Sequence, residues 1–147
     1  MKNQLLYLMI FVLLIPSLKV SAQSNQTKLT PDKRLQEVFS KQELNDMQTN
    51  KPESIVLYNY LIENAYYISD KAEGPIENIK YVTLRKDFAI YFNEDVNAIS
   101  PKTFNYLKYN FKIDNLHYIS YSLGNGKYLV FYPQSVTTTK FNSNKTK

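Results

Sequence analysis

The chain has 147 residues, a formal net charge of +5, and neither cysteine nor tryptophan. This length is enough for one domain with a hydrophobic core of its own, but without cysteine no disulfide can support that core. Acidic and basic residues are interspersed along the chain, which argues against a nucleic-acid partner or a polybasic membrane-binding surface.

The N-terminus has the pattern of a secretory signal peptide. Lys2 supplies a positive charge, and the apolar run from Leu5 to Ile15 ends at Pro16. A transmembrane anchor is the alternative, but a membrane span needs about 20 apolar residues and this run is shorter. We therefore predict that residues 1–22 form a signal peptide that is removed on export.

Residues of modest size mark the cleavage site. Val20 and Ala22 stand third and first before Gln23, so cleavage is predicted before Gln23. Loss of Lys2 and Lys19 lowers the formal net charge from +5 to +3. Because the chain has no cysteine to carry a lipid, we expect a periplasmic or secreted protein that is not a lipoprotein. We expect no transmembrane span after cleavage.

The mature chain divides into three parts. Residues 23–29 are mostly polar and predict a flexible lead-in, and residues 30–133 predict a single domain. Residues 134–147 carry no acidic residue and predict a flexible tail. No internal repeat and no long linker interrupts the domain.

Two short helices, or one helix with a kink, are predicted at the start of the domain. The first helix is predicted to start near Thr30, which can act as its cap. Pro31 suits the first helical turn, and Asp32 places a negative charge at the positive end of the helix dipole. Ser40 and Glu43 have the spacing of a capping box, which predicts a second helix start.

A longer helix is predicted from Glu53 to Ile68. Apolar residues cover most of its circumference, and such a helix is usually packed on more than one side. We therefore expect it to be the central helix of the domain and to cover one face of a sheet.

After a break at residues 71–75, apolar residues no longer recur at helical spacing but alternate with polar residues, as in a strand. Helices followed by strands predict an α+β domain, with N-terminal helices packed on a C-terminal antiparallel sheet of four to five strands. The hairpin turn, Gly124 to Gly126, supplies residues that tolerate positive φ. The predicted strands are Ile79–Leu84, Phe88–Phe92, Leu107–Ile113, His117–Leu123 and Lys127–Tyr132.

Signals for catalysis are sparse, and we expect no cofactor and no catalytic set. His117 is the only histidine, and Ser120 would point to the opposite face of its strand. A carboxylate-dependent hydrolase of glycans or peptidoglycan stays open as an alternative, with Glu63, Glu77 and Asp95 as its candidate acids.

The densest group of oxygen ligands is Asn93, Asp95 and Asn97, whose spacing is similar to the start of a calcium-binding EF-hand loop. Ala98 stands where that loop needs glycine, and Phe104 where it needs glutamate. These departures exclude an EF-hand. An irregular calcium loop and a solvated turn are left, of which we favour the turn.

Tyrosine is unusually frequent, at 13 residues. A tyrosine-lined sheet suits the binding of a protein, peptide or glycan, because each ring buries area while its hydroxyl stays in water. Tyrosine also favours strands for packing alone, and an AT-rich genome would raise its frequency. The candidate binding surface consists of Tyr109, Tyr118, Tyr121, Tyr128 and Tyr132.

The sequences FNYLKYNF at Phe104–Phe111 and SLGNGKYLVFYP at Ser122–Pro133, with the helical half before them, resemble small exported proteins of Bacteroidetes-type bacteria. The resemblance implies a Gram-negative envelope setting and assigns no catalytic residue. We expect a non-enzymatic binding or envelope-assembly protein with a protein or peptide partner. An inhibitor of secreted proteases, acting through the loop Asn93–Pro101, is a further alternative.

Overall fold

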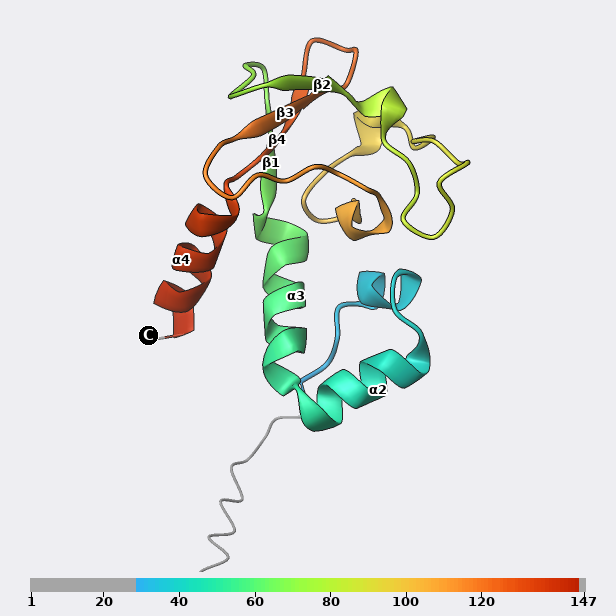
Figure 1. The fold of residues 1–147 in the computed structure, drawn as a ribbon, viewed down its shortest axis with the longest axis vertical. Coiled ribbons are helices and arrows are strands. Elements are labelled where there is room, and N and C mark those ends of the chain that lie inside the picture. The colour runs from blue at the N-terminus through green and yellow to red at the C-terminus, as the bar shows by residue number, and fades with distance from the viewer. Residues whose placement is uncertain (1–28, 146–147) are drawn as a thin grey trace, which may run out of the picture.

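The computed structural model describes residues 29–145, so the predicted signal peptide and its cleavage site lie outside the described residues. Within them, three α-helices and a four-stranded sheet confirm the α+β class. The sheet lies at one end and the helices extend away from it (Figure 1). No helix in this part of the chain is both long and apolar enough to cross a membrane. The elements are α2 (Lys41–Asn50), α3 (Pro52–Asn64), β1 (Tyr66–Ser69), β2 (Ile76–Asn78), β3 (Ile119–Ser122), β4 (Tyr128–Phe131) and α4 (Gln134–Lys145).

The N-terminal helices begin where a capping side chain is available. The first element is a short 3-10 helix, Lys33–Glu37, whose cap is Asp32 rather than the predicted Thr30. The predicted capping box at the start of α2 is confirmed. Ser40 Oγ accepts a hydrogen bond from the Glu43 N–H at 3.2 Å, and the Glu43 carboxylate accepts one from the Ser40 N–H at 2.7 Å.

Helix α3 is shorter than predicted. It starts with Pro52 in its first turn and ends at Asn64, so the predicted continuation to Ile68 is wrong. After Ala65 the chain enters β1, whose four residues all pair antiparallel with β4. Tyrosine and isoleucine suit a strand, and this pairing favours the strand over further helix. In Figure 1, α3 approaches the sheet end-on and leads directly into β1, instead of lying across a sheet face.

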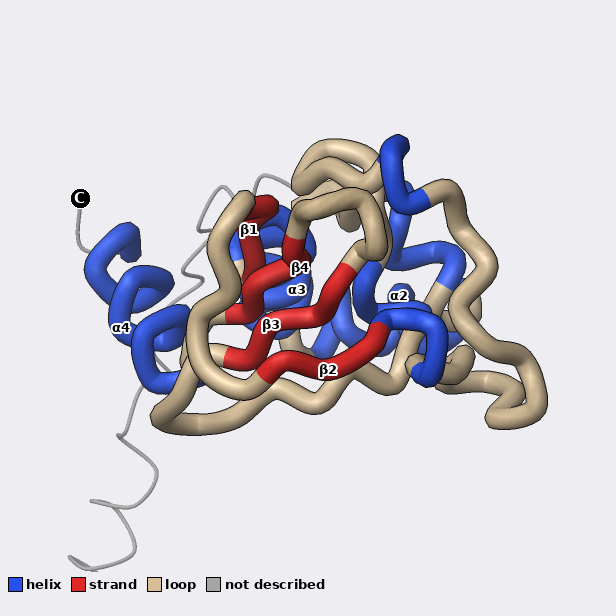
Figure 2. Tube along the Cα trace, turned by 90° about the horizontal axis from the view of Figure 1, so that it is seen from above, coloured by secondary structure: helices blue, strands red, loops and turns tan. Residues whose placement is uncertain are grey.

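The sheet has the strand order β1-β4-β3-β2 and is mixed rather than wholly antiparallel. β4 pairs antiparallel with β1 and β3, as the predicted hairpin requires, whereas β2 pairs parallel with β3. Figure 2 shows the four strands side by side, with β1 and β2 at the edges. In the hairpin turn, Gly124 and Gly126 have φ values of 78° and 79°, which confirms the predicted need for positive φ.

The strand predicted at Leu107–Ile113 is wrong. The segment begins inside a 3-10 helix, Tyr106–Lys108, and continues without joining the sheet. The segment packs against the core face of the sheet, and this packing explains why its apolar residues alternate with polar ones. The Phe111 ring contacts Phe131 of β4 and Tyr121 of β3, with centroid distances of 5.0 and 4.8 Å.

The strands predicted at Ile79–Leu84 and Phe88–Phe92 are also wrong as strands of the sheet. A 3-10 helix occupies Ile79–Tyr81. The remaining residues meet in one isolated antiparallel bridge, between Thr83 and Tyr91. The two segments therefore form a small hairpin outside the sheet.

The connection from β1 to β2 crosses from one edge of the sheet to the other and passes over the start of β3 (Figure 2). There the Glu73 N–H donates to Ser120 Oγ at 2.7 Å, and this hydroxyl donates to the Glu73 carbonyl at 2.7 Å. Ser120 is completely buried. Its hydroxyl therefore satisfies both backbone groups of Glu73, which lies outside any strand.

We expect Ser120→Ala to lower the free energy of unfolding by about 1–3 kcal/mol, because both backbone groups of Glu73 would lose their partner at a partly buried position. Urea unfolding followed by circular dichroism measures the loss. Ser122→Ala is the matched control, since the Ser122 hydroxyl on the same strand has no hydrogen-bond partner among the described residues. Equal losses in the two variants would contradict the anchoring role of Ser120.

The flexible tail predicted at residues 134–147 is wrong for most of its length, because Gln134–Lys145 form α4. Threonine, serine and asparagine are poor helix formers, and they obscured this helix in the sequence. Thr137 and Phe141 are buried, and the Phe141 ring packs against Tyr60 of α3 at 5.3 Å. Packing against α3 therefore orders the segment (Figure 1).

Candidate functional site

The structure does not bring the five candidate tyrosines onto one surface. Tyr109 and Tyr121 are buried in the core, with rings 6.0 and 4.8 Å from Phe111. Their hydroxyls are also occupied: Tyr109 donates to Glu94 at 2.7 Å, and Tyr121 accepts from the Lys112 N–H at 2.8 Å. These two residues are therefore structural, and their assignment to a binding surface is wrong.

Tyr118 and Tyr132 do come together, on the opposite face of the sheet. Their ring centroids are 5.8 Å apart, and Tyr67 of β1 lies 4.9 Å from Tyr132. Lys140 of α4 covers the Tyr132 ring at 4.0 Å. Tyr67 was missed in the sequence because its segment has helical periodicity. The group is only half buried, but α4 and the β1–β2 connection occupy much of the space around it.

Tyr128 is the remaining candidate. It lies on β4 and is half buried, and by the alternation of strand side chains it shares a face with Tyr132. It pairs with Ser69 of β1 and Ser122 of β3. Tyr128 lines none of the hollows described below.

The candidate calcium ligands are used within their own loop. Asp95 caps the 3-10 helix Val96–Ala98 and accepts a hydrogen bond from the Asn97 N–H at 2.9 Å. The Asn97 side-chain oxygen accepts from Asn125 at 2.9 Å, and Asn93 is exposed. No cluster of three histidine or acidic side chains in residues 29–145 has the arrangement of a metal site. The favoured turn accounts for these side chains.

The loop Asn93–Pro101 does not protrude as a protease-inhibitory loop would. Val96 and Ile99 pack against the hydrophobic core. Thr103 Oγ1 lies 2.8 Å from the Ser100 hydroxyl and donates to the Ala98 carbonyl at 3.3 Å. The segment is therefore anchored along its length to the body of the domain.

The three candidate acids of a hydrolase serve separate roles. Glu63 accepts a hydrogen bond from buried Arg34 at 3.1 Å, Glu77 lies on the exposed edge strand β2, and Asp95 is a helix cap. None of them lines the hollows described below. These three acids therefore do not share a common substrate space in the described part of the chain.

His117 lies at the side of an open groove of about 550 Å³ over the start of β3. Its Nδ1 is 3.1 Å from Asp114, whose pKa is lowered mainly by hydrogen bonds from the N–H groups of Leu116 and His117. The nearest serine hydroxyl in sequence, that of Ser120, is buried and bonded to Glu73. The groove thus contains an aspartate–histidine pair but no serine among its lining residues, and the pair orders a turn.

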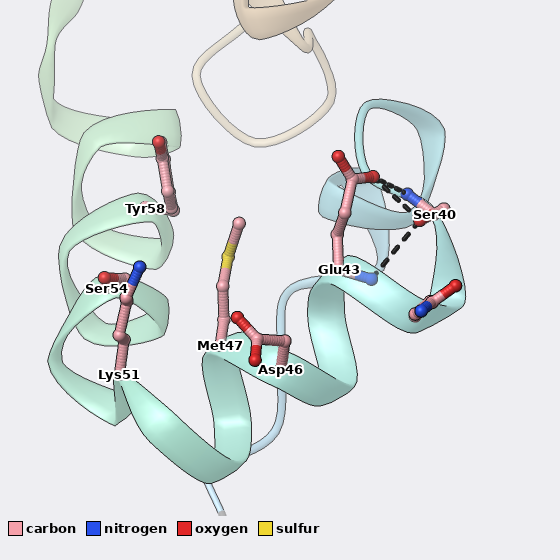
Figure 3. A pocket seen from close by; sticks show the side chains of 8 residues that line it. Ser40, Glu43, Asp46, Met47, Lys51, Ser54 and Tyr58 are labelled. Carbon is pink, nitrogen blue, oxygen red and sulfur yellow. Dashed lines mark hydrogen bonds between the residues drawn. The ribbon is translucent and has the colours of Figure 1, made fainter.

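A second open groove, of about 490 Å³, lies between α2 and α3 (Figure 3). Most of its lining residues have polar side chains, and the hydrogen bonds drawn there belong to the capping box of Ser40 and Glu43. Met47 and Tyr58 project from the two facing helices. The groove follows from the angle between the helices and presents no convergent set of unpaired polar groups.

The exposed apolar residues are the most distinctive surface feature. Among residues 29–145, every exposed large hydrophobic side chain except Leu116 lies between Ile76 and Tyr91. Tyr81 and Phe88 are 77% and 72% exposed. We call residues 81–91 the aromatic hairpin, and its exposed apolar members are Tyr81, Phe88, Ile90 and Tyr91.

The backbone of the aromatic hairpin is well anchored. The Leu84 N–H donates to the Ile90 carbonyl at 2.8 Å, and the Arg85 N–H donates to the Lys108 carbonyl at 2.7 Å. At the tip, Asp87 Oδ1 accepts from the Ala89 N–H at 2.9 Å. In Figure 1 this yellow-green segment projects from the side of the domain near α2. The sequence showed its apolar alternation, but alternation alone does not distinguish a surface hairpin from a core strand.

Comparisons with protein-family models, curated proteins and solved structures found no match to the chain. The functional argument therefore depends on the geometry of its own residues.

Proposed function

We propose that this chain is an exported, non-enzymatic binding protein that docks a protein partner through the aromatic hairpin. The concentration of exposed apolar side chains between Ile76 and Tyr91 carries the proposal. Exposed apolar groups gathered on one part of a surface are typical of a binding site. Export is proposed from the N-terminal sequence, and the resemblance to small exported proteins supports an envelope setting.

The composition of the hairpin favours a protein partner over a lipid surface. Tyrosine, phenylalanine and arginine are enriched at protein interfaces. Lys80, Arg85 and Lys86 are balanced by Glu77 and Asp87, which leaves little net positive charge to attract an anionic membrane. The anchored backbone lowers the conformational entropy that docking would remove.

Site-specific cross-linking tests the proposal in living cells. A photoreactive phenylalanine analogue placed at Phe88 should yield one discrete cross-linked protein in the envelope fraction of the native host. The same analogue at Leu116, which is 68% exposed but outside the hairpin, is the matched control and should yield none. The mass of the recovered chain tests export as well, since the mature protein would start at Gln23.

The purified partner then allows a quantitative measurement. We expect Phe88→Ser with Tyr91→Ser to weaken binding by at least about 30-fold, because each residue has the chemistry of an interface hot spot. Leu116→Ser should change binding by less than about twofold. Both variants should keep the wild-type melting temperature. Equal cross-linking at both positions, cross-linking only to a second copy of the chain, or vesicle binding without a protein partner would overturn the proposal.

A further inference from the structure

A cavity of about 340 Å³ lies between α3, α4 and the segment that follows Tyr106. This volume is at the small end of the range for small-molecule sites, and its walls are mainly apolar, as such sites usually are. Its apolar lining includes Leu57 and Leu61 of α3, together with Leu107 and Ile113. Figure 1 shows α3 and α4 running side by side below the sheet.

One hydroxyl in this wall, that of Tyr106, has no protein partner among residues 29–145 and is open to the cavity. Tyr106 is only 4% exposed, and its ring is fixed between Phe131 and Tyr66 at centroid distances of 5.3 and 5.7 Å. Its hydroxyl makes no hydrogen bond within residues 29–145 and is not closed off by the core, so it is free to bond to a group that enters the cavity. In contrast, the hydroxyl groups of two other core tyrosines, Tyr109 and Tyr121, are hydrogen-bonded. Tyr106 is therefore placed to donate to a group inside the cavity.

An unpaired cation lines the same cavity. Arg85 forms no ion pair with any carboxylate in the described part of the chain, whereas Arg34 and Lys108 each contact two. Its backbone is fixed by the hydrogen bond from its N–H to the Lys108 carbonyl at 2.7 Å. Burial raises the pKa of Tyr106, and the charge of Arg85 opposes that rise. Arg85 and Tyr106 line the same cavity.

Tyr58 of α3 adds a third donor. It lines the cavity, its ring packs against Phe39 at 5.0 Å, and its hydroxyl is without a hydrogen-bond partner among the described residues. It also contributes to raising the pKa of Tyr106. Side chains that carry one guanidinium and two phenol hydroxyls thus line the same mainly apolar chamber.

We propose that this cavity binds a singly charged amphiphile, a carboxylate with a short acyl chain. Arg85, Tyr106 and Tyr58 hold the carboxylate, and the chain lies among Leu57, Leu61, Leu107 and Ile113. Guanidinium and phenol groups donate hydrogen bonds, and a carboxylate accepts them. Hydrogen bonds to a charged acceptor are stronger than those between neutral groups. A single unpaired cation neutralises one negative charge, which favours a carboxylate over a doubly charged phosphate. The acyl chain gains from leaving water for the apolar walls.

Calorimetric titration with octanoate and decanoate tests the proposal on the mature chain. We expect saturable one-to-one binding with a Kd below about 1 mM. Octyltrimethylammonium, which has the same chain and the opposite charge, should not bind, and neither should inorganic phosphate. NMR contacts from the octanoate chain to leucine and isoleucine methyl groups would locate it in the cavity.

The variants distinguish a specific contact with the carboxylate head group from a general effect of positive charge. Arg85→Gln should weaken octanoate binding by at least about tenfold and Tyr106→Phe by about threefold to tenfold. Lys80→Gln removes an exposed cation outside the cavity and should have no effect. Phe88→Ser with Tyr91→Ser should also leave octanoate binding unchanged, so this site and the proposed protein-binding hairpin can fail independently.

Several results would overturn the proposal. These are the absence of saturable octanoate or decanoate binding, equal binding of the ammonium amphiphile, equal effects of Arg85→Gln and Lys80→Gln, and binding of phosphate as tight as that of octanoate. Melting temperatures of the variants exclude unfolding as the cause of lost binding. Arg85 is exposed and without an ion pair in residues 29–145, so its replacement should leave the melting temperature unchanged.

Discussion

Gly74→Ala should destabilise the domain by about 3–5 kcal/mol, far more than alanine at either glycine of the hairpin turn. Gly74 has φ +69°, where a side chain adds strain. A Cβ at this position would lie 2.0 Å from the carbonyl oxygen of Tyr118, which is backbone and cannot rotate away. The adjoining backbone is fixed, because the Ser120 N–H donates to the Pro75 carbonyl at 2.9 Å. The β1–β2 connection would therefore have to lift from β3.

Gly124→Ala and Gly126→Ala are the matched controls. These glycines have φ values of 78° and 79°, but a Cβ added at either position would meet no described atom within 4 Å. Each replacement should therefore lower the free energy of unfolding only by the strain of a side chain at positive φ, about 1–2 kcal/mol. Urea unfolding of the three variants measures the difference. A loss for Gly74→Ala no larger than for the controls would show that the connection does not pack closely on β3.

Local sequence signals predicted the local structure well. The capping box of Ser40 and Glu43 is complete within four residues, and the turn from Gly124 to Gly126 needs only positive φ. Both signals depend on hydrogen bonds or backbone angles within a few residues of the signal itself. They were therefore readable without any knowledge of the fold.

The errors arose where distant partners decide the structure. Tyr66–Ser69 continues the helical period of α3, and only its pairing with β4, far along the chain, makes it a strand. Leu107–Ile113 alternates because it covers the sheet, without a ladder of its own. Helix α4 depends on the packing of Phe141 against α3. Such contacts are not visible in a single sequence.

The candidate sites were also misjudged where contacts between distant residues decide the structure. Tyr109 and Tyr121 have the residue type of a binding surface, but burial and hydrogen bonds assign them to the core. The aromatic hairpin was missed because Phe88 and Ile90 have the spacing of buried strand residues. The cavity near Arg85 and Tyr106 combines residues from separate segments of the chain, so no spacing in the sequence could mark it.

Arg34→Ala should lower the free energy of unfolding by about 2–4 kcal/mol. Breaking a buried ion pair destabilises by about 3–5 kcal/mol, and the half-exposed Glu63 reduces that effect here. Arg34 is only 4% exposed and contacts Asp32 through two hydrogen bonds, at 3.0 and 2.7 Å. It also donates to the Pro101 carbonyl at 2.9 Å, so it joins the N-terminal 3-10 helix to α3 and to a distant loop.

Lys33→Ala is the matched control, because Lys33 is the exposed neighbour of Arg34 on the same short helix. It should change the free energy of unfolding by less than about 0.5 kcal/mol. Urea unfolding at neutral pH compares the two variants. Losses of equal size would show that the buried network does not contribute to stability.

The same network predicts a dependence on pH. Hydrogen bonds from the Arg34 side chain hold the pKa of Asp32 below its usual range. A carboxyl of this kind stabilises the fold above its unfolded pKa of about 3.9, and the contribution is lost as the pH falls through the lower folded value. Acid should therefore destabilise the wild type more steeply than Arg34→Ala or Asp32→Asn, in which this contribution is already absent. Glu43 and Asp114 also have lowered pKa values, so a shallower acid dependence should persist in both variants. Parallel curves for the wild type and Arg34→Ala would assign the whole acid dependence to those other carboxylates.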